Sequence, residues 1–71
     1  MKHDNSEVLR KLNWRCDQPT PLTDREKRHA QIIRLRLEER LPYWQIAERL
    51  QIKIGNATVR FSLARRWIER L

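Results

Sequence analysis

The stretch PYWQIAERLQIKIGNATVRFSLARRWIER, residues 42–70, decides the fold because it predicts two amphipathic helices joined by a tight turn. Pro42 suits the first turn of a helix, where its missing N–H costs nothing. Apolar residues then recur at helical spacing and predict a helix from Tyr43 to Leu50. The inward-facing residues of this helix are Ile46, Ala47 and Leu50.

Residues 51–55 break the periodicity and predict the turn. Gly55 is free to adopt a positive φ there, and Asn56 is placed to cap the following helix. We expect that helix to run from Ala57 to about Arg70. An apolar stripe that recurs along it should close the core. The members of the stripe are Val59, Leu63, Trp67 and Leu71.

A further helix precedes this pair. Thr23 and Glu26 match a capping box, in which each side chain satisfies the backbone N–H of the other residue, so the helix should begin at Asp24. Pro42 should end it, because proline disfavours the helical conformation of the residue before it. Its expected core face consists of Ala30, Ile33, Leu37 and Leu41.

The residues before Leu22 predict a short arm. Residues 17–21 are polar and hold two of the three prolines, which is typical of a linker. Ahead of the linker, Ser6 can cap a short helix with apolar residues on one face. These residues are Val8, Leu9 and Leu12, with Trp14 just beyond.

Helical periodicity throughout, with a single glycine, predicts an all-α fold. We expect an N-terminal arm and linker over residues 1–21 and a three-helix helix-turn-helix domain over residues 22–71. Ile32 and Leu35 lie off the expected core face of the first domain helix. Either the arm covers these two residues or they form a protein interface.

The charge of the chain favours a polyanionic partner, nucleic acid first. Sixteen Lys and Arg residues stand against nine acidic residues, which gives a net charge of +7. The single cysteine, Cys16, excludes an internal disulfide. No apolar run approaches the roughly 20 residues that span a bilayer, so we expect a cytoplasmic protein that has no membrane partner.

Catalysis has no support in the sequence. It contains no phosphate-cradling glycine loop, no zinc-ligand spacing and no nucleophile with a recognisable base. His3 and His29 have no Cys or acidic partner at metal-ligand spacing. We therefore expect a protein that is not an enzyme and that holds neither a metal nor a cofactor.

Two short helices with a tight turn, the second helix amphipathic and basic, are typical of a unit that places its second helix in the major groove of DNA. Opposite the expected core stripe, the helical wheel places residues that can contact base edges. They are Asn56, Thr58, Arg60, Phe61, Ser62 and Arg65. Other basic residues are expected to meet phosphates. They are Lys53, Arg66, Arg70, Arg34, Arg36 and Arg40. If the second helix is rotated, Phe61 belongs instead to the core.

A resemblance covers residues 22–71. Three pieces carry it: the opening Leu22-Thr23-Asp24-Arg25-Glu26, the stretch Ile46-Ala47-Glu48-Arg49-Leu50, and Thr58-Val59-Arg60 leading into Leu63-Ala64-Arg65-Arg66. Together they resemble region four of bacterial sigma factors and, more loosely, the helix-turn-helix output domains of response regulators. The resemblance implies a three- or four-helix fold whose last helix contacts promoter bases. Without a region two beside it, the domain looks more like a small phage or plasmid regulator.

The chain departs from the family pattern at the turn. The family has Leu-Gly-Ile followed by a polar residue, whereas Gln51 occupies the glycine position here. Matching Thr58-Val59 to the family's Thr-Val pair needs about two extra residues around Ile54. An ungapped alternative pairs Gly55-Asn56 with a Gly-Asn found in some members. Both registers of the last helix remain open.

Three further hypotheses concern partners. A homodimer would double the DNA contacts and bind two half-sites. The chain could instead be an adaptor, of the antiterminator or anti-sigma type, that binds RNA polymerase or another regulator through exposed apolar residues. Those residues would be Phe61, Ile68, Ile32 and Leu35. RNA is a third partner, with Trp14, Trp44 and Trp67 as stacking platforms.

Overall fold

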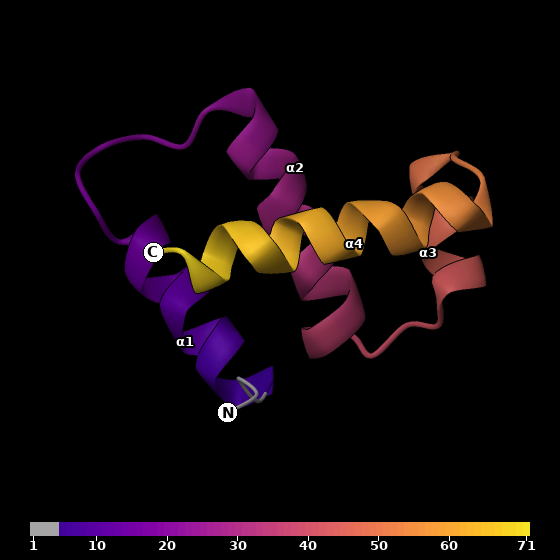
Figure 1. Ribbon diagram of the computed structural model, residues 1–71, viewed down its shortest axis with the longest axis horizontal. Helices are drawn as coiled ribbons and strands as arrows, with labels where there is room; N and C mark the ends of the chain where they lie inside the picture. Colours follow the sequence, from indigo (N-terminus) through magenta and orange to yellow (C-terminus); the bar gives the residue numbers. More distant parts are fainter. Residues whose placement is uncertain (1–4) are drawn as a thin grey trace.

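The computed structural model describes residues 5–71, and this part of the chain is helical, without a strand (Figure 1). The element bounds are α1 (Asn5–Cys16), α2 (Asp24–Ile33), the π-helical segment η1 (Arg34–Glu38) that continues α2, α3 (Tyr43–Leu50) and α4 (Ile54–Glu69). The expected all-α fold is therefore confirmed. The linker expected over residues 17–21 lies between α1 and α2.

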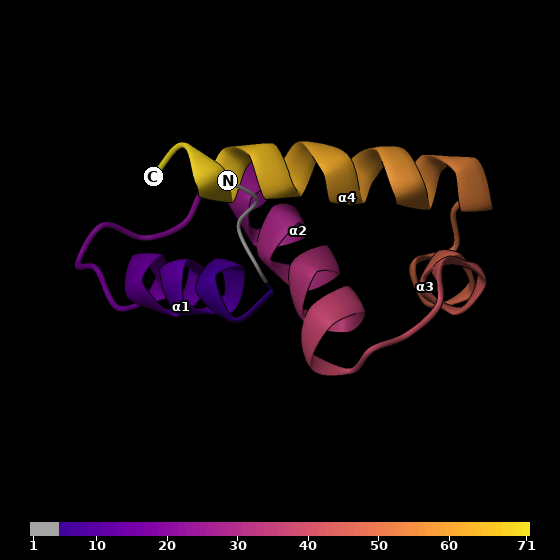
Figure 2. The ribbon, with the colours of Figure 1, turned by 60° about the horizontal axis from the view of Figure 1, so that its bottom comes forward.

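The longest helix, α4, runs across the other three. Figure 2 shows α1, α2 and α3 side by side beneath α4, and α4 contacts each of them. In this view α3 is seen end-on while α4 lies in the plane, so the two helices on either side of the turn cross steeply. One long side of α4 is consequently free of any other described element.

Two expected helix boundaries are confirmed. At the start of α2 the Thr23 hydroxyl accepts the backbone N–H of Glu26 at 3.2 Å, and the Glu26 carboxylate accepts the backbone N–H of Thr23 at 3.0 Å. This is the capping box that the sequence predicts. The next helix, α3, spans Tyr43–Leu50 as expected, with Pro42 as its N-cap.

The end of α2 differs from the expected run to Leu41. The last turn widens, so that the N–H of Glu39 reaches the carbonyl of Arg34, five residues back, at 3.0 Å. Arg40 then adopts a left-handed conformation with φ 55°, and the N–H of Leu41 returns to the carbonyl of Leu35 at 3.1 Å. The left-handed conformation of Arg40 ends the helix before Pro42, because it lets the N–H of Leu41 bind a carbonyl of the last turn that would otherwise have no donor.

The turn between α3 and α4 is made by Gln51, which has φ 55° and ψ 48°. The N–H of Ile52 reaches the carbonyl of Ala47 at 2.9 Å and closes α3. After this turn, α4 begins at Ile54. The expected start at Ala57, the positive φ of Gly55 and the capping role of Asn56 are therefore wrong, since both residues lie inside the helix.

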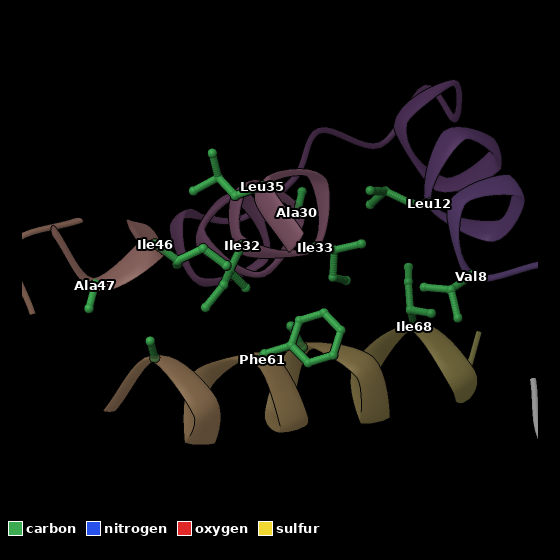
Figure 3. Close-up of a cluster of buried hydrophobic side chains, with 12 residues drawn as sticks. Val8, Leu12, Ala30, Ile32, Ile33, Leu35, Ile46, Ala47, Phe61 and Ile68 are labelled. Atoms are coloured by element: carbon green, nitrogen blue, oxygen red, sulfur yellow. The ribbon is translucent and has the colours of Figure 1, made fainter. Parts of the chain in front are cut away.

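The buried face of α4 is opposite to the expected one. Its buried residues are Ala57, Phe61, Ala64 and Ile68. Figure 3 shows Phe61 and Ile68 pointing from α4 into the core. Val59 and Leu63 are exposed by 57% and 44%, and Leu71 is also exposed, so their expected core role is wrong. Only Trp67 of that stripe packs partly against the core. The helix carries two apolar stripes of equal period, and the one with small alanines lets α2 and α3 approach closely.

The central helix α2 is buried on two sides. In Figure 3, Ile33 lies on the side of Leu12 of α1, while Ile32 and Leu35 lie toward Ile46 of α3. All five side chains belong to one core cluster. Ile32 and Leu35 are thus buried within the described chain, so the protein interface expected as one alternative for them is wrong. The arm helix α1 contributes Val8 and Leu12 to that same core.

Candidate nucleic-acid interface

The free side of α4 presents a mixed polar and aliphatic surface. We define the outward face as Asn56, Val59, Ser62, Leu63 and Arg66, all of which are exposed. A shallow hollow of about 270 Å³ lies on this face and is lined by Val59, Ser62, Leu63 and Arg66, together with Thr58. Because α1, α2 and α3 all lie on the other side of α4, the outward face protrudes from the molecule (Figure 2).

Five arginines lie on or beside the outward face, and we call them the arginine cluster. Arg25 and Arg28 belong to the first half of α2, Arg60 and Arg66 belong to α4, and Arg70 is the C-cap of α4. Two hollows of about 450 and 550 Å³ between these helices connect the two groups, since Arg25, His29 and Leu63 line both hollows. The sequence analysis missed the α2 members, although their spacing on the first turns of a capped helix points both to one side.

The arginine cluster is electrostatically unsatisfied. All five side chains are exposed, and none makes an ion pair or a hydrogen bond with a described residue. Three other arginines of the described chain are paired: Arg15 with Glu26, Arg34 with Glu38 and Arg49 with Glu39. The five positive charges of the arginine cluster therefore lie close together, where an anionic partner can neutralise them.

Glu26, the acidic residue beside the cluster, already has partners. Its carboxylate accepts the Thr23 N–H, the Arg15 guanidinium at 3.3 Å and the Trp67 indole N–H at 3.2 Å. The backbone hydrogen bond from Thr23, with smaller contributions from Arg15 and Trp67, lowers the pKa of Glu26 against the opposing effect of desolvation. Glu26 consequently stays ionised at neutral pH and ties α1, α2 and α4 together.

His29 lies between the two hollows and stacks on Trp67, with ring centroids 5.5 Å apart. Burial lowers the pKa of His29, and the positive charge of Arg25 lowers it further, while Glu26 acts in the opposite direction. Its imidazole is therefore mostly neutral at pH 7, and it forms a flat, uncharged part of the lining of both hollows.

The residues expected to contact bases differ in their exposure. Asn56, Arg60 and Ser62 are exposed, as a groove contact requires. Thr58 is half-buried, and its hydroxyl donates to the carbonyl of Gly55 at 2.7 Å. The expectation for Phe61 is wrong, because this side chain is only 7% exposed and lies in the core.

Arg65, the sixth expected base contact, lies on the flank of α4 beside Phe61. Its Nε donates to Glu69 at 3.3 Å. It lines a separate hollow of about 550 Å³, together with Arg36, Arg40 and Tyr43. Arg65 is thus turned away from the outward face. The rotation of α4 places Arg66 on that face, where the sequence predicted Arg65.

The expected phosphate contacts separate into two groups. Lys53, Arg66 and Arg70 are exposed next to the outward face or at the ends of α4. The other three lie on η1 or just after it. There Arg34 binds Glu38 at 3.0 Å, while Arg36 donates to the carbonyl of Leu41 at 2.9 Å and stacks 4.5 Å above the Tyr43 ring. Arg40 is exposed at the left-handed position.

Among the described residues there is no sign of a membrane-spanning helix or of a metal site. No described helix has the length and apolarity to cross a membrane. Within residues 5–71, no three His, Cys, Asp or Glu side chains are grouped to hold a metal ion. His3 lies outside the described residues. Cys16 is an exposed thiol 3.8 Å from the Arg34 guanidinium.

The chain matched no protein-family model, no curated protein and no solved structure when it was compared with them. The outward face and the arginine cluster therefore have to be interpreted from their own geometry and charge.

Proposed function

We propose that the protein binds double-stranded DNA by placing the outward face of α4 in the major groove, and that it regulates transcription in this way. The observation that carries the proposal is the arginine cluster, which lacks ion pairs with described residues and lies on or beside the outward face of a protruding helix. A helix is about 10–12 Å across with its side chains, and the major groove of B-DNA is about 12 Å wide. In this arrangement the groove receives α4 while phosphates on its edges neutralise the arginines.

The connection between α3 and α4 supports a helix-turn-helix. Three residues separate the helices, and Gln51 has the left-handed backbone that glycine adopts most readily. Gln51 is the residue at the glycine position of the sigma region four pattern. The turn therefore favours the ungapped register, in which Gly55-Asn56 pairs with the family's Gly-Asn. On this basis we propose that the domain is a sigma region four-like module.

The rotation of α4 changes which residues are proposed to contact bases and which are proposed to contact phosphates. Asn56, Ser62 and Arg66 are the polar residues of the outward face, and each has side-chain chemistry that suits base edges. Arg60, Arg70 and Lys53 are proposed to contact phosphates, together with Arg25 and Arg28. Arg65 has no part in this assignment.

Selection from a random pool of duplex DNA, followed by a salt titration of the enriched site, tests the proposal. We expect a discrete motif whose affinity falls with salt, because each phosphate contact releases counterions. Arg66→Ala should weaken binding to that site by about 1–3 kcal/mol if Arg66 contacts a base. Arg10→Ala on α1 is the matched control, since it removes the same charge from an exposed position outside the arginine cluster.

Two outcomes would contradict the proposal. One is a failure to enrich any motif, with all binding abolished by moderate salt. The other is an equal loss of affinity in Arg66→Ala and Arg10→Ala, because that result would mean that only net charge matters. A palindromic motif would in addition support binding as a homodimer.

The adaptor hypothesis loses its original basis. Phe61, Ile68, Ile32 and Leu35 were its apolar contacts, and all of them are buried. The RNA hypothesis is weakened as well, because Trp67 is engaged with His29 and Glu26. Trp14 and Trp44 are exposed but lie on different helices, α1 and α3.

A further inference from the structure

Two aliphatic side chains occupy the centre of the outward face. Val59 and Leu63 follow one another by one helical turn, and they are exposed by 57% and 44%. They line the same shallow hollow as Ser62 and Arg66. Exposed aliphatic groups gain free energy when a partner removes them from water.

The surroundings of these side chains restrict what can cover them. Arg60 and Arg66, which make no ion pair with a described residue, flank these side chains: Arg60 lines a hollow with Leu63, and Arg66 lines the hollow that Val59 and Leu63 share. The occupant must therefore offer small apolar groups close to negative charge. A second copy of this chain is disfavoured, because like charges would meet at the interface. An acidic amphipathic helix has suitable chemistry but docks in a groove, whereas this face protrudes (Figure 2).

We infer that Val59 and Leu63 recognise thymine C5-methyl groups in the major groove; the inference rests on the proposed function and specifies its target. The thymine methyl is the apolar group among the base edges of that groove, and it lies between two rows of phosphates. Four residues of helix span about 6 Å, whereas successive base pairs are separated by about 3.4 Å. A helix lying along the groove thus brings the two side chains to thymines about two base-pair steps apart.

Replacing thymine with deoxyuridine tests the inference, because it removes the methyl group and leaves every hydrogen-bonding group in place. Duplexes of the selected site are synthesised with deoxyuridine at one thymine position at a time, and their affinities are measured by fluorescence anisotropy. At one or two positions we expect about fourfold weaker binding, which corresponds to the burial of one methyl group. At the remaining thymines the affinity should not change.

Variants assign the effect to the two side chains. Val59→Ala and Leu63→Ala should each remove the discrimination between thymine and uracil at one position. Trp14→Ala is the control, because it shortens an equally exposed apolar side chain on α1 and should keep the discrimination. Far-UV circular dichroism checks that each variant is folded.

Equal affinity for thymine and uracil at every position, with duplex binding retained, would overturn the inference and leave the proposed function intact. Discrimination that persists in both variants would also overturn it, because the methyl contact would then come from other residues. If no duplex is bound at all, the proposed function fails and this inference fails with it. An acidic amphipathic peptide that binds Val59 and Leu63 in the absence of DNA binding would identify the alternative occupant.

Discussion

At the scale of single residues, Phe61 and Leu63 have opposite environments although they lie two positions apart on α4. Phe61 packs in the core with an edge-on contact to Tyr43, at 6.1 Å between ring centroids, whereas Leu63 lies on the outward face. Both residues are apolar, so hydrophobicity alone would predict burial for each of them. Only their position around the helix axis separates them.

Truncating each side chain measures this difference. Phe61→Ala should destabilise the fold by about 3–5 kcal/mol, because it leaves a cavity in the core. Leu63→Ala should cost no more than about 1 kcal/mol, since Leu63 is already 44% exposed. Urea denaturation followed by circular dichroism gives both values. Reversed magnitudes would mean that α4 packs through its other stripe.

Gly55 offers a second test at this scale. It lies in the first turn of α4 with negative φ, and a Cβ atom added there would meet nothing within 4 Å. Gly55→Ala should therefore stabilise the protein by about 0.5–1 kcal/mol, because alanine loses less conformational entropy in a helix. A rise in the thermal midpoint checks this. A destabilised Gly55→Ala would indicate a positive φ and a later start of the helix.

At the scale of elements, the Glu26 carboxylate connects three helices. It receives hydrogen bonds from Thr23 at the start of α2, from Arg15 near the end of α1 and from Trp67 in α4. These bonds favour the ionised form and lower the pKa of Glu26 in the folded state. The stabilisation is therefore fully present above the ordinary value of 4.5 and is lost as the pH falls below it.

Acid titration of stability tests this linkage. The urea midpoint of the protein should decline as the pH falls below about 4.5, the ordinary value for glutamate. Glu26→Gln should be less stable at pH 7 and should show a shallower decline in acid. Glu48→Gln is a suitable control, because Glu48 is exposed on α3 and should retain the full decline. Identical acid profiles for Glu26→Gln and the unaltered protein would contradict the assignment.

His29 should make the stability of the fold begin to decline at a higher pH than Glu26 does. Its pKa is lower in the folded state than the ordinary value of 6.5, chiefly through burial. A group that folds preferentially in its neutral form contributes stability above its unfolded pKa, and this contribution falls as the pH drops through 6.5. In the bound complex, nearby phosphates would act in the opposite direction by favouring the protonated imidazole.

At the scale of the whole molecule, α1 is part of the core. Leu12 is fully buried against the cluster that holds Ile33 and Ile68. A chain of 71 residues has a free energy of unfolding on the order of 4–10 kcal/mol, so a single core contact is a large share of the total. Residues 5–16 therefore stabilise the surface that α4 presents on its other side.

Leu12→Ala tests the contribution of α1. We expect a loss of about 2–5 kcal/mol and one cooperative unfolding transition, because a single core unfolds as a unit. Trp14→Ala on the same helix should have little effect, since Trp14 is mostly exposed. An unchanged urea midpoint for Leu12→Ala, or two separate transitions, would show that α1 is independent of the remaining helices.

Local interactions determined what the sequence could establish by itself. The capping box at Thr23, the limits of α3 and the linker before α2 all depend on residues that are neighbours along the chain. Backbone hydrogen bonds and proline sterics act over four or five residues, so their outcome can be predicted without knowledge of the tertiary structure. The net charge likewise needed only a count of residues.

Only the tertiary structure decided which side of α4 is buried and which arginines remain without partners. The stripe through Val59 and Leu63 and the stripe through Phe61 and Ala64 have the same helical period, so periodicity cannot choose between them. The choice depends on how closely α2 and α3 can approach α4, and the small alanine side chains allow the closer approach. Ion pairing depends in the same way on side chains far apart in sequence, as Glu26 and Arg15 show.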